Sequence, residues 1–342
     1  MLSLPNLFSS LVEPVLGILG DMWKRRALVL GGGAAFALAA LFTALSQSFA
    51  PLLLSFMLFN PASGAFVSLS QASLMDFDPD RREQNMARWT FAGSVGVVAG
   101  PLLLSAAVAL GPGWRGLFFG FAALTLLTLL AARRQPFPNG ATHSPNPSPD
   151  KAGFRAGIVN ALRALRRREV LHWLTLLAFS DLMLDVLLGF LALYFVDVVG
   201  VTETQAGLAV AVWTGVGLVG DLLLIPLLER VRGLSYLRVS AAAMLFLFPA
   251  FLLTPGVEAK LILLGLLGLL NSGWYAILQA QVYAAMPGQS GTVMAVDNIF
   301  GIAESLIPLG LGVVAQQYGL SVAMWLLLAG PAALLVGLPR RK

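Results

Sequence analysis

The sequence predicts an all-α membrane protein, because the chain is very apolar, carries few charges and contains repeated apolar runs long enough to cross a bilayer. Of its 342 residues, 58% are hydrophobic and 11% are charged, whereas an average soluble domain is about one quarter charged. The mean hydropathy is +0.82. A helix that crosses the hydrocarbon core needs about 20 apolar residues. The runs show no long alternation of apolar and polar residues, so they fit poorly with the strands of a β-barrel.

Eleven apolar runs, bounded by charged residues, Pro and Gly, are predicted to cross the membrane. The first group comprises residues 2–20, 27–46, 51–75, 88–110 and 114–132. The second group comprises residues 170–199, 205–228, 237–253, 259–286, 292–318 and 320–338. The predicted domains are therefore an N-terminal half (1–132), a cytoplasmic linker (133–169) and a C-terminal half (170–342).

The linker has two parts that differ in composition. Residues 135–151 read QPFPNGATHSPNPSPDK and are too rich in Pro, Asn and Ser to pack, which predicts a flexible segment. Residues 155–170 read RAGIVNALRALRRREV, which is typical of a basic amphipathic helix lying on the anionic inner leaflet. A solvated connector is the alternative interpretation of the second part.

The positions of the basic residues predict the orientation of the spans. All Lys and Arg residues except Arg115 and Lys260 fall in one set of alternate loops and the C-terminus, and such loops stay on the cytoplasmic side during insertion. The C-terminus is therefore expected in the cytoplasm, and the protein in the plasma or inner membrane. Because the basic residues lie in these loops, the net charge of +5 does not indicate a nucleic-acid partner.

The two predicted halves contain an internal repeat. An acid near the end of the first span and an acid eight residues earlier are matched by a similar pair in the seventh span, and polar or Pro residues match elsewhere at nearly the same offset. The matched pairs are Asp21 with Glu229, Glu13 with Asp221, Asn60 with Asn271, and Pro101 with Pro308. The repeat predicts two halves in the same orientation.

Residues 17–26, GILGDMWKRR, resemble the signature loop of the major facilitator superfamily, written G-x-L-a-D-r-x-G-r-k. The matching residues are Gly17, Leu19, Asp21, Arg25 and Arg26, while Met22 and Lys24 replace the usual Arg and Gly. In that family the loop joins helices two and three of twelve. The resemblance therefore implies a two-half helical bundle in which the eleven spans are family helices 2 to 12. It also implies that family helix one is lacking from the sequence given, through truncation or a late start codon.

The resemblance also implies a role for this loop in gating. Asp21 would accept hydrogen bonds at the start of the tenth span, near Gly291 and Thr292, and Arg25 and Arg26 would pair with acids on the cytoplasmic side. These contacts would exist in one of two conformations and would hold the outward-open state. The alternative is that the basic residues serve only to set topology.

Two further family patterns are partly present. Gly96, Gly100 and Pro101 fit the G-x-x-x-G-P pattern of antiporters in helix five, although close helix packing through small residues is an equal explanation. Asn60 stands where the R-x-x-q-G pattern of helix four has its arginine. If the protein is coupled to protons, that position does not carry the coupling.

Acids within the predicted spans are candidate proton or substrate sites, because an acid at the bilayer centre costs about 2.5–3.5 kcal/mol. Asp181 and Asp185 lie four residues apart in the sixth span and share a helix face, so both cannot ionise cheaply and one is expected to hold a proton. Glu13 and Asp221 occupy equivalent depths in the two halves, and Glu304 lies in the tenth span. Hydrogen bonding between helices is the structural alternative.

Polar residues in the third and ninth spans complete the predicted cavity, which the family places between helices four, seven and ten. They are Asn60, Asn271, Trp274 and Gln279. A cavity with acids and aromatic side chains would suit cationic or amphipathic solutes. There is no cysteine, no Walker loop and no catalytic constellation, so neither an ATP-driven pump nor an enzyme is indicated.

The predicted function is proton-coupled efflux of a small organic solute by alternating access. The expected partners are the solute and the lipid bilayer, the chain is expected to act as a monomer, and no cofactor or metal is expected besides the coupling proton. An uptake permease or uniporter of the same fold is the first alternative. A membrane enzyme or receptor, or an inactive truncated product, are the others.

Overall fold

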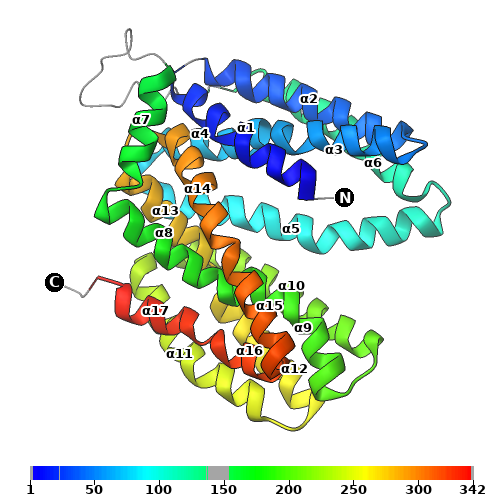
Figure 1. Cartoon of the computed structure of the whole chain (residues 1–342), viewed down its shortest axis with the longest axis vertical. Helices are drawn as coiled ribbons and strands as arrows, with labels where there is room; N and C mark the ends of the chain where they lie inside the picture. Colours follow the sequence, from blue (N-terminus) through cyan, green and yellow to red (C-terminus); the bar gives the residue numbers. More distant parts are fainter. Residues whose placement is uncertain (1–2, 23, 136, 138–153, 340–342) are drawn as a thin grey trace. The chain divides into compact units, whose positions relative to one another are not determined.

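The structure is a computed structural model that describes residues 3–22, 24–135, 137 and 154–339, and every regular element in these ranges is a helix (Figure 1). Ten helical segments of the described residues are long and apolar enough to span a membrane. They are Arg25–Leu45, Phe49–Phe77, Pro79–Ala109, Gly113–Ala132, Arg168–Val199, Glu203–Leu227, Gly233–Leu253, Val257–Ala285, Ser290–Tyr318 and Leu320–Gly337. The predicted all-α membrane architecture is thus confirmed, with ten such segments against eleven predicted spans.

The remaining predicted span is helix α1 (Ser3–Met22), which has 20 residues but is not among the ten. Its polar residues lower its hydropathy: Asn6, Ser9, Ser10 and Glu13 lie on it, and all four line a cavity described below. The helix is therefore less apolar because part of its surface faces a polar space.

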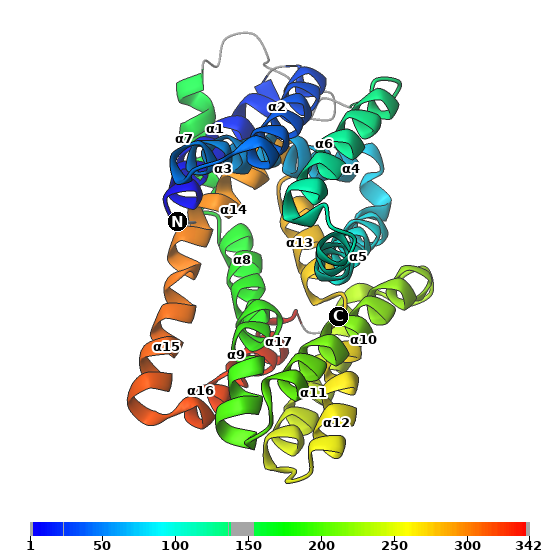
Figure 2. The same ribbon diagram turned by 90° about the vertical axis from the view of Figure 1, so that its right-hand side faces the viewer.

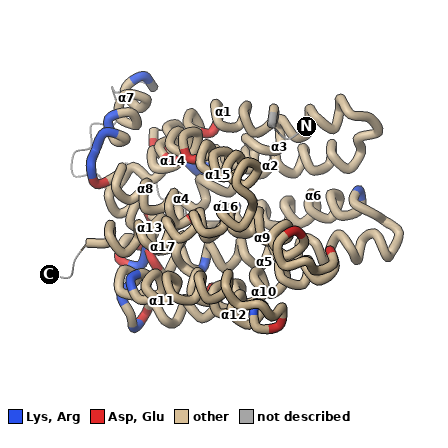
Figure 3. Tube along the Cα trace, turned by 60° about the horizontal axis from the view of Figure 1, so that its bottom comes forward, with Lys and Arg blue, Asp and Glu red and all other residues tan. Residues whose placement is uncertain are grey.

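Several spans consist of more than one helical element. In chain order, the helices after α1 are α2 (Arg25–Leu45), α3 (Phe49–Ser63), η1 (Gly64–Ser68), α4 (Leu69–Phe77), η2 (Pro79–Arg81), α5 (Arg82–Ala109), α6 (Gly113–Ala132), α7 (Phe154–Ala164), α8 (Arg168–Asp181), η4 (Leu182–Val186), α9 (Leu187–Leu193), η5 (Tyr194–Val199), α10 (Glu203–Leu227), α11 (Gly233–Leu253), α12 (Val257–Asn271), α13 (Trp274–Ala285), α14 (Ser290–Glu304), α15 (Leu306–Tyr318), α16 (Leu320–Leu326) and α17 (Ala329–Gly337). Figure 3 shows long stretches of these helices without charged residues.

The chain packs as two compact units, each built from segments that are distant in sequence. Unit 1 comprises Met1–Asp80, Ala99–Val170 and Tyr283–Ile302, and within it α2 packs against α3 and α6. Unit 2 comprises Arg81–Val98, Leu171–Val282 and Ala303–Lys342, and within it α12 packs against α10 and α11 (Figure 2). These units group segments by how they pack and not by their order in the chain. They do not test the domain boundaries expected from the sequence, which stay a prediction.

The second part of the linker forms helix α7, as its pattern predicts. The helix packs on α1, and a Cβ added to Gly157 would touch the side chain of Ile18. Ala161 and Ala164 are buried on the same side. Whether α7 lies on a lipid surface stays a prediction, and the flexible segment expected at 135–151 lies almost wholly outside the described residues.

Three spans change their helical geometry near their middle. Elements η1 and η4 are π-helical turns, which are rare and often occur at functional sites. The span that contains α12 and α13 is broken at Ser272 and Gly273, where Gly273 has a φ of +81°, a conformation that a glycine adopts without a steric cost. Such interruptions inside a membrane are tolerated where the backbone borders protein or a wet cavity.

Lys260 is a buried cation without an acidic partner among the described residues. Its side chain is 4% exposed, and its Nζ donates to the Phe251 carbonyl (2.6 Å), the Leu252 carbonyl (3.1 Å) and the Tyr194 hydroxyl (3.0 Å). The ammonium group also lies 5.0 Å from the ring centroid of Phe251. The Lys260 ammonium group therefore donates to carbonyls at the C-terminal end of α11, which have no helical N–H partner. These bonds connect α12, which carries Lys260, with α11 and η5.

We expect Lys260→Met to destabilise the protein by about 1–3 kcal/mol, because buried acceptors would lose their donor. The measurement is the thermal unfolding of the purified protein in detergent. Lys24→Met is the matched control, since Lys24 is exposed and should change the unfolding temperature little. Equal stability of the two variants would show that the Lys260 contacts do not support the fold.

Candidate functional site

The Asp21 carboxylate lies at the first residues of α14. It accepts hydrogen bonds from the backbone N–H of Gly291 (2.8 Å) and Thr292 (2.7 Å) and from the Thr292 hydroxyl (2.7 Å). The free N–H groups of a helix start and its dipole both favour a negative charge at this place. The contacts that the resemblance implies for Asp21 are therefore present, while their part in gating stays a proposal.

Arg25 connects Asp21 to a second buried acid, Asp76. Its guanidinium is fully buried and donates to Asp21 at 2.8 Å, to Asp76 at 2.6 Å and to the Gly20 carbonyl at 3.1 Å. Asp76 also accepts a hydrogen bond from the Ser290 hydroxyl at 2.5 Å. We call this set, with Gly291 and Thr292, the Asp21 network. Arg26 has a different setting, since it is exposed and donates to the Arg133 carbonyl.

Two glycines allow the backbones of α1 and α14 to meet beside the Asp21 network. A Cβ added to Gly17 would collide with the Gly291 carbonyl oxygen, and a Cβ added to Gly291 would collide with the Gly17 carbonyl oxygen. Each position therefore requires glycine for the same reason. Gly17 of the signature loop therefore has a steric role. Leu19 has an apolar side chain and takes no part in the polar contacts of the Asp21 network.

A second acid, Glu83 at the start of α5, holds the start of α11. Its Oε2 accepts from the Gly233 N–H at 3.1 Å, and its Oε1 accepts from the Gln281 amide of α13 at 2.8 Å. The next residue, Gln84, donates to the Leu228 carbonyl at the end of α10 at 3.0 Å. We call these five side-chain and backbone groups the Glu83 contact. Like the Asp21 network, it joins a segment before the linker to segments after it.

Unit 1 contains a polar cavity of about 410 Å³ around Glu13. Glu13 accepts a hydrogen bond from Ser9 at 2.5 Å, and Asn60 donates to Asn6 at 2.7 Å. Gly64, in the π-helical turn η1, lies against Glu13: a Cβ there would be 2.6 Å from the glutamate Cγ. The remaining lining residues are Ser10, Ser63, Val67, Ser68 and Asn298.

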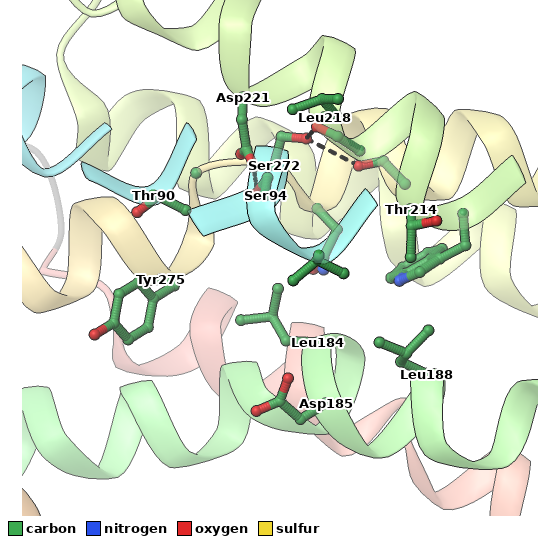
Figure 4. Close-up of a pocket in the computed structure, with 16 residues that line it drawn as sticks. Thr90, Ser94, Leu184, Asp185, Leu188, Thr214, Leu218, Asp221, Ser272 and Tyr275 are labelled. Atoms are coloured by element: carbon green, nitrogen blue, oxygen red, sulfur yellow. Dashed lines mark hydrogen bonds between the residues drawn. The ribbon is translucent and has the colours of Figure 1, made fainter. Parts of the chain in front are cut away.

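Unit 2 contains a cavity of about 150 Å³ between Asp185 and Asp221, which lie on opposite sides of it (Figure 4). Asp221 accepts a hydrogen bond from Ser94 of α5 at 2.5 Å, and Asp185 is part of the π-helical turn η4. Asn271 donates to the Met183 carbonyl at 3.0 Å, but its Oδ1 is buried without a partner among the described residues. The other lining residues include Thr90, Trp213, Thr214, Ser272, Gly273 and Tyr275.

Four of the predicted site residues do not line these two cavities. Trp274 is fully buried and donates to Ser240 at 2.9 Å, so it packs between helices. Gln279 is 2% exposed. Glu304 has one buried oxygen without a hydrogen bond to a described residue. Asp181 precedes the π-helical turn and is not on the wall that Asp185 helps to form.

Gly96 and Gly100 have open space beside them among the described residues, so the close packing expected there stays a prediction. A Cβ added at either position would meet no atom within 4 Å, and Pro101 is exposed. These small residues therefore do not bring a neighbouring helix into close contact within their units, and the antiporter pattern gains no structural explanation here.

Sequence reasoning missed Asp76, Ser290, Ser94 and the Glu83 contact. A signal existed for Asp76, because an acid at a span end followed closely by Arg81 repeats the order of Asp21 and Arg25. No sequence pattern links Glu83 with Gly233, which lies 150 positions away. Among the described residues, no three His, Asp or Glu side chains gather as ligands for a metal ion.

The comparison with protein families decides the identity of the fold. The sequence matches the Major Facilitator Superfamily over residues 1–303. The chain belongs to this superfamily. None of the curated proteins compared with it is significantly similar in sequence. Membership explains the repeated halves and the signature loop at Asp21.

Solved structures of superfamily transporters are similar to this one over nearly the whole chain. The transporter FucP in the outward conformation has a TM-score of 0.76 at 17% identity, covering 98% of this chain and 88% of FucP. The human organic anion transporter MFSD10 (TETRAN) has a TM-score of 0.70 at 23% identity, covering 98% and 82%. The proton:xylose symporter XylE has a TM-score of 0.67 at 14% identity, covering 97% and 83%. At these identities the likeness establishes the superfamily fold: a multi-pass, all-helical membrane protein.

We expect Arg25→Ala to destabilise the protein by about 3–5 kcal/mol, because it leaves Asp21 and Asp76 buried without their cation. Thermal unfolding in detergent measures the loss. Arg26→Ala removes the same charge from an exposed position and should cost less than about 1 kcal/mol. A small effect of Arg25→Ala would mean that the two carboxylates are stabilised without the arginine.

Proposed function

We propose that this protein is a secondary transporter that exchanges a small organic solute for protons by alternating access, in the direction of efflux. The proposal rests on the cavity between Asp185 and Asp221, where two acids inside the membrane face one another across a small space. No Lys or Arg is among its described lining residues. Buried carboxylates without cations are costly unless they share protons, face water or bind a cation.

The same cavity has the groups to hold a solute. The unpartnered Asn271 Oδ1 can accept a hydrogen bond, as can the buried Thr90 hydroxyl, which has no partner among the described residues. Trp213 and Tyr275 add aromatic surface. Acids with aromatic walls favour a solute with a cationic or amphipathic character. The hydroxyl- and amide-lined cavity around Glu13 supports a second polar subsite in the other unit.

For gating, we propose that the Asp21 network and the Glu83 contact close the cytoplasmic side in one conformation and separate in the other. Each joins the part of the chain before the linker to the part after it through hydrogen bonds between an acid and a helix start. Such bonds are strong when made but limited in number, so two states can interconvert. This proposal places the C-terminus in the cytoplasm and treats one chain as the working unit.

The direction of proton movement distinguishes this proposal from uptake. FucP is described as a fucose:proton symporter and XylE as a proton:xylose symporter, and a symport function in this chain would move solute and proton together. Antiport instead acidifies the compartment that the solute leaves. The two functions therefore predict opposite pH changes under the same solute gradient.

We test the coupling in proteoliposomes that contain the pH-sensitive dye pyranine. A panel of solutes, including ethidium, L-fucose and D-xylose, is added outside, and the internal pH is recorded. Antiport predicts a solute-dependent rise in internal pH, since protons leave as solute enters. Asp185→Asn and Asp221→Asn should each slow this change at least about tenfold, because a neutral amide cannot exchange a proton.

Solute exchange without a pH gradient provides the control for this test. The two Asn variants should retain exchange of a labelled uncharged solute of the panel, because the cavity keeps its size and no charge on the solute needs the carboxylates. A fall in internal pH would indicate symport and contradict efflux. Solute transport by the wild type without any pH change would remove proton coupling altogether.

The gate is tested by cysteine labelling, which the absence of native cysteine makes free of background. Thr90→Cys, in the unit 2 cavity, is labelled from the cytoplasmic side with a membrane-impermeant maleimide. Glu83→Ala should raise the labelling rate about tenfold, since the start of α11 and the Gln281 amide both lose their acceptor. Glu229→Ala, at an exposed acid, should leave the rate unchanged. An equal rate in both variants would show that Glu83 does not gate this cavity.

A further inference from the structure

A third cavity of about 500 Å³ lies in unit 2 beside the loop of residues 228–232, which joins α10 to α11. Three arginines line it: Arg230, Arg232 and Arg238. Glu83 and Glu229 are also on its wall. This cavity shares no lining residue with the one between Asp185 and Asp221, although Glu83 on its wall also belongs to the proposed gate.

Three arginines and two acids line the cavity, so its described wall carries an excess of positive charge. None of them forms an ion pair with a described residue. Both oxygens of Glu83 already accept hydrogen bonds, from Gly233 and Gln281, and Arg238 makes one contact, to the Pro339 carbonyl. The cavity therefore presents more donors and positive charge than its own walls use. Three further basic residues follow Pro339 directly in the sequence.

The position of the cavity on the helices places it at a membrane surface. It opens where two membrane-spanning helices, α10 and α11, end and begin. The neighbouring residues Val231 and Val239 are 37% and 69% exposed, as residues in contact with lipid chains would be. Arginines set at this level lie beside lipid headgroups, whose phosphates match the planar guanidinium in charge and geometry.

We propose that this cavity binds the phosphate of an anionic lipid headgroup in the adjacent leaflet, through Arg230, Arg232 and Arg238. Basic residues placed only to orient the chain could stand anywhere in the loop. Here the three arginines line one cavity of about 500 Å³, and the exposed apolar residues Val231 and Val239 lie beside it. The proposal stands independently of the transported solute, because no residue of the Asp185 and Asp221 cavity takes part.

The purified protein in detergent is titrated with phosphatidylglycerol, phosphatidylcholine or inorganic phosphate, and bound lipid is counted by native mass spectrometry. Phosphatidylglycerol should bind and raise the unfolding temperature, whereas phosphatidylcholine should bind far more weakly. The triple variant Arg230→Gln, Arg232→Gln, Arg238→Gln should weaken phosphatidylglycerol binding roughly a hundredfold, since each basic residue at a membrane surface adds to the attraction.

The matched control is Lys24→Gln, Arg133→Gln, Arg134→Gln, which removes three positive charges from exposed positions outside the cavity and outside the basic segment of residues 155–170. This control should bind phosphatidylglycerol as the wild type does. Equal loss in the two triple variants, or equal binding of both lipids to the wild type, would overturn the proposal. Equal protection of the wild type by inorganic phosphate would also overturn it, because the ligand would then be a soluble anion.

Discussion

The burial of a single guanidinium between two carboxylates is the interaction on which the rest of this structure depends. Arg25 is fully buried in α2, and it holds Asp21 of α1 and Asp76 of α4 beside the start of α14, so that four helices meet at this point. The oxygens that Arg25 does not contact, Oδ2 of Asp21 and Oδ1 of Asp76, accept hydrogen bonds from Thr292 and Ser290 at the start of α14. A buried charge is tolerated only where its partners and hydrogen bonds are complete, so the network is satisfied as a set. The close backbone approach at Gly17 and Gly291 belongs to the same requirement, because side chains there would separate the donors from the acid.

The Asp21 network and the Glu83 contact each place a carboxylate at the start of a helix, but their acids do not occupy matching positions of the sequence repeat. Asp21 stands at the end of α1 and meets the start of α14, whereas Glu83 stands at the start of α5 and meets the start of α11. The residue that matches Asp21 in the sequence repeat is Glu229, which is exposed and lines the arginine cavity instead. The two halves therefore use residues at different repeat positions, Asp21 and Glu83, to place a carboxylate at a helix start.

The sequence was sufficient for the all-α fold, its spans and the Asp21 contact, because these depend on composition and on a local motif. It was also sufficient to single out Glu13 and Asp221 as acids within the predicted spans, and in the structure each of them lines a cavity of its own unit. The sequence could not pair Glu83 with Gly233, since only tertiary packing brings those segments together. The sequence also could not show that Trp274 is buried and donates to Ser240, because burial is decided by neighbours that are distant in the chain. The roles expected for Trp274 and for the glycines of α5 stay predictions.

The π-helical turn η1 has a consequence for the register of its span. It precedes α4, and α4 carries Asp76 near its end. A π-helical turn contains one residue more than an α-helical turn would need. If residues 64–68 took up α-helical geometry with no residue removed, everything after them would turn by about 100° about the helix axis. Asp76 would then point away from Arg25. The wide turn therefore fixes the phase in which this span presents Asp76 to Arg25.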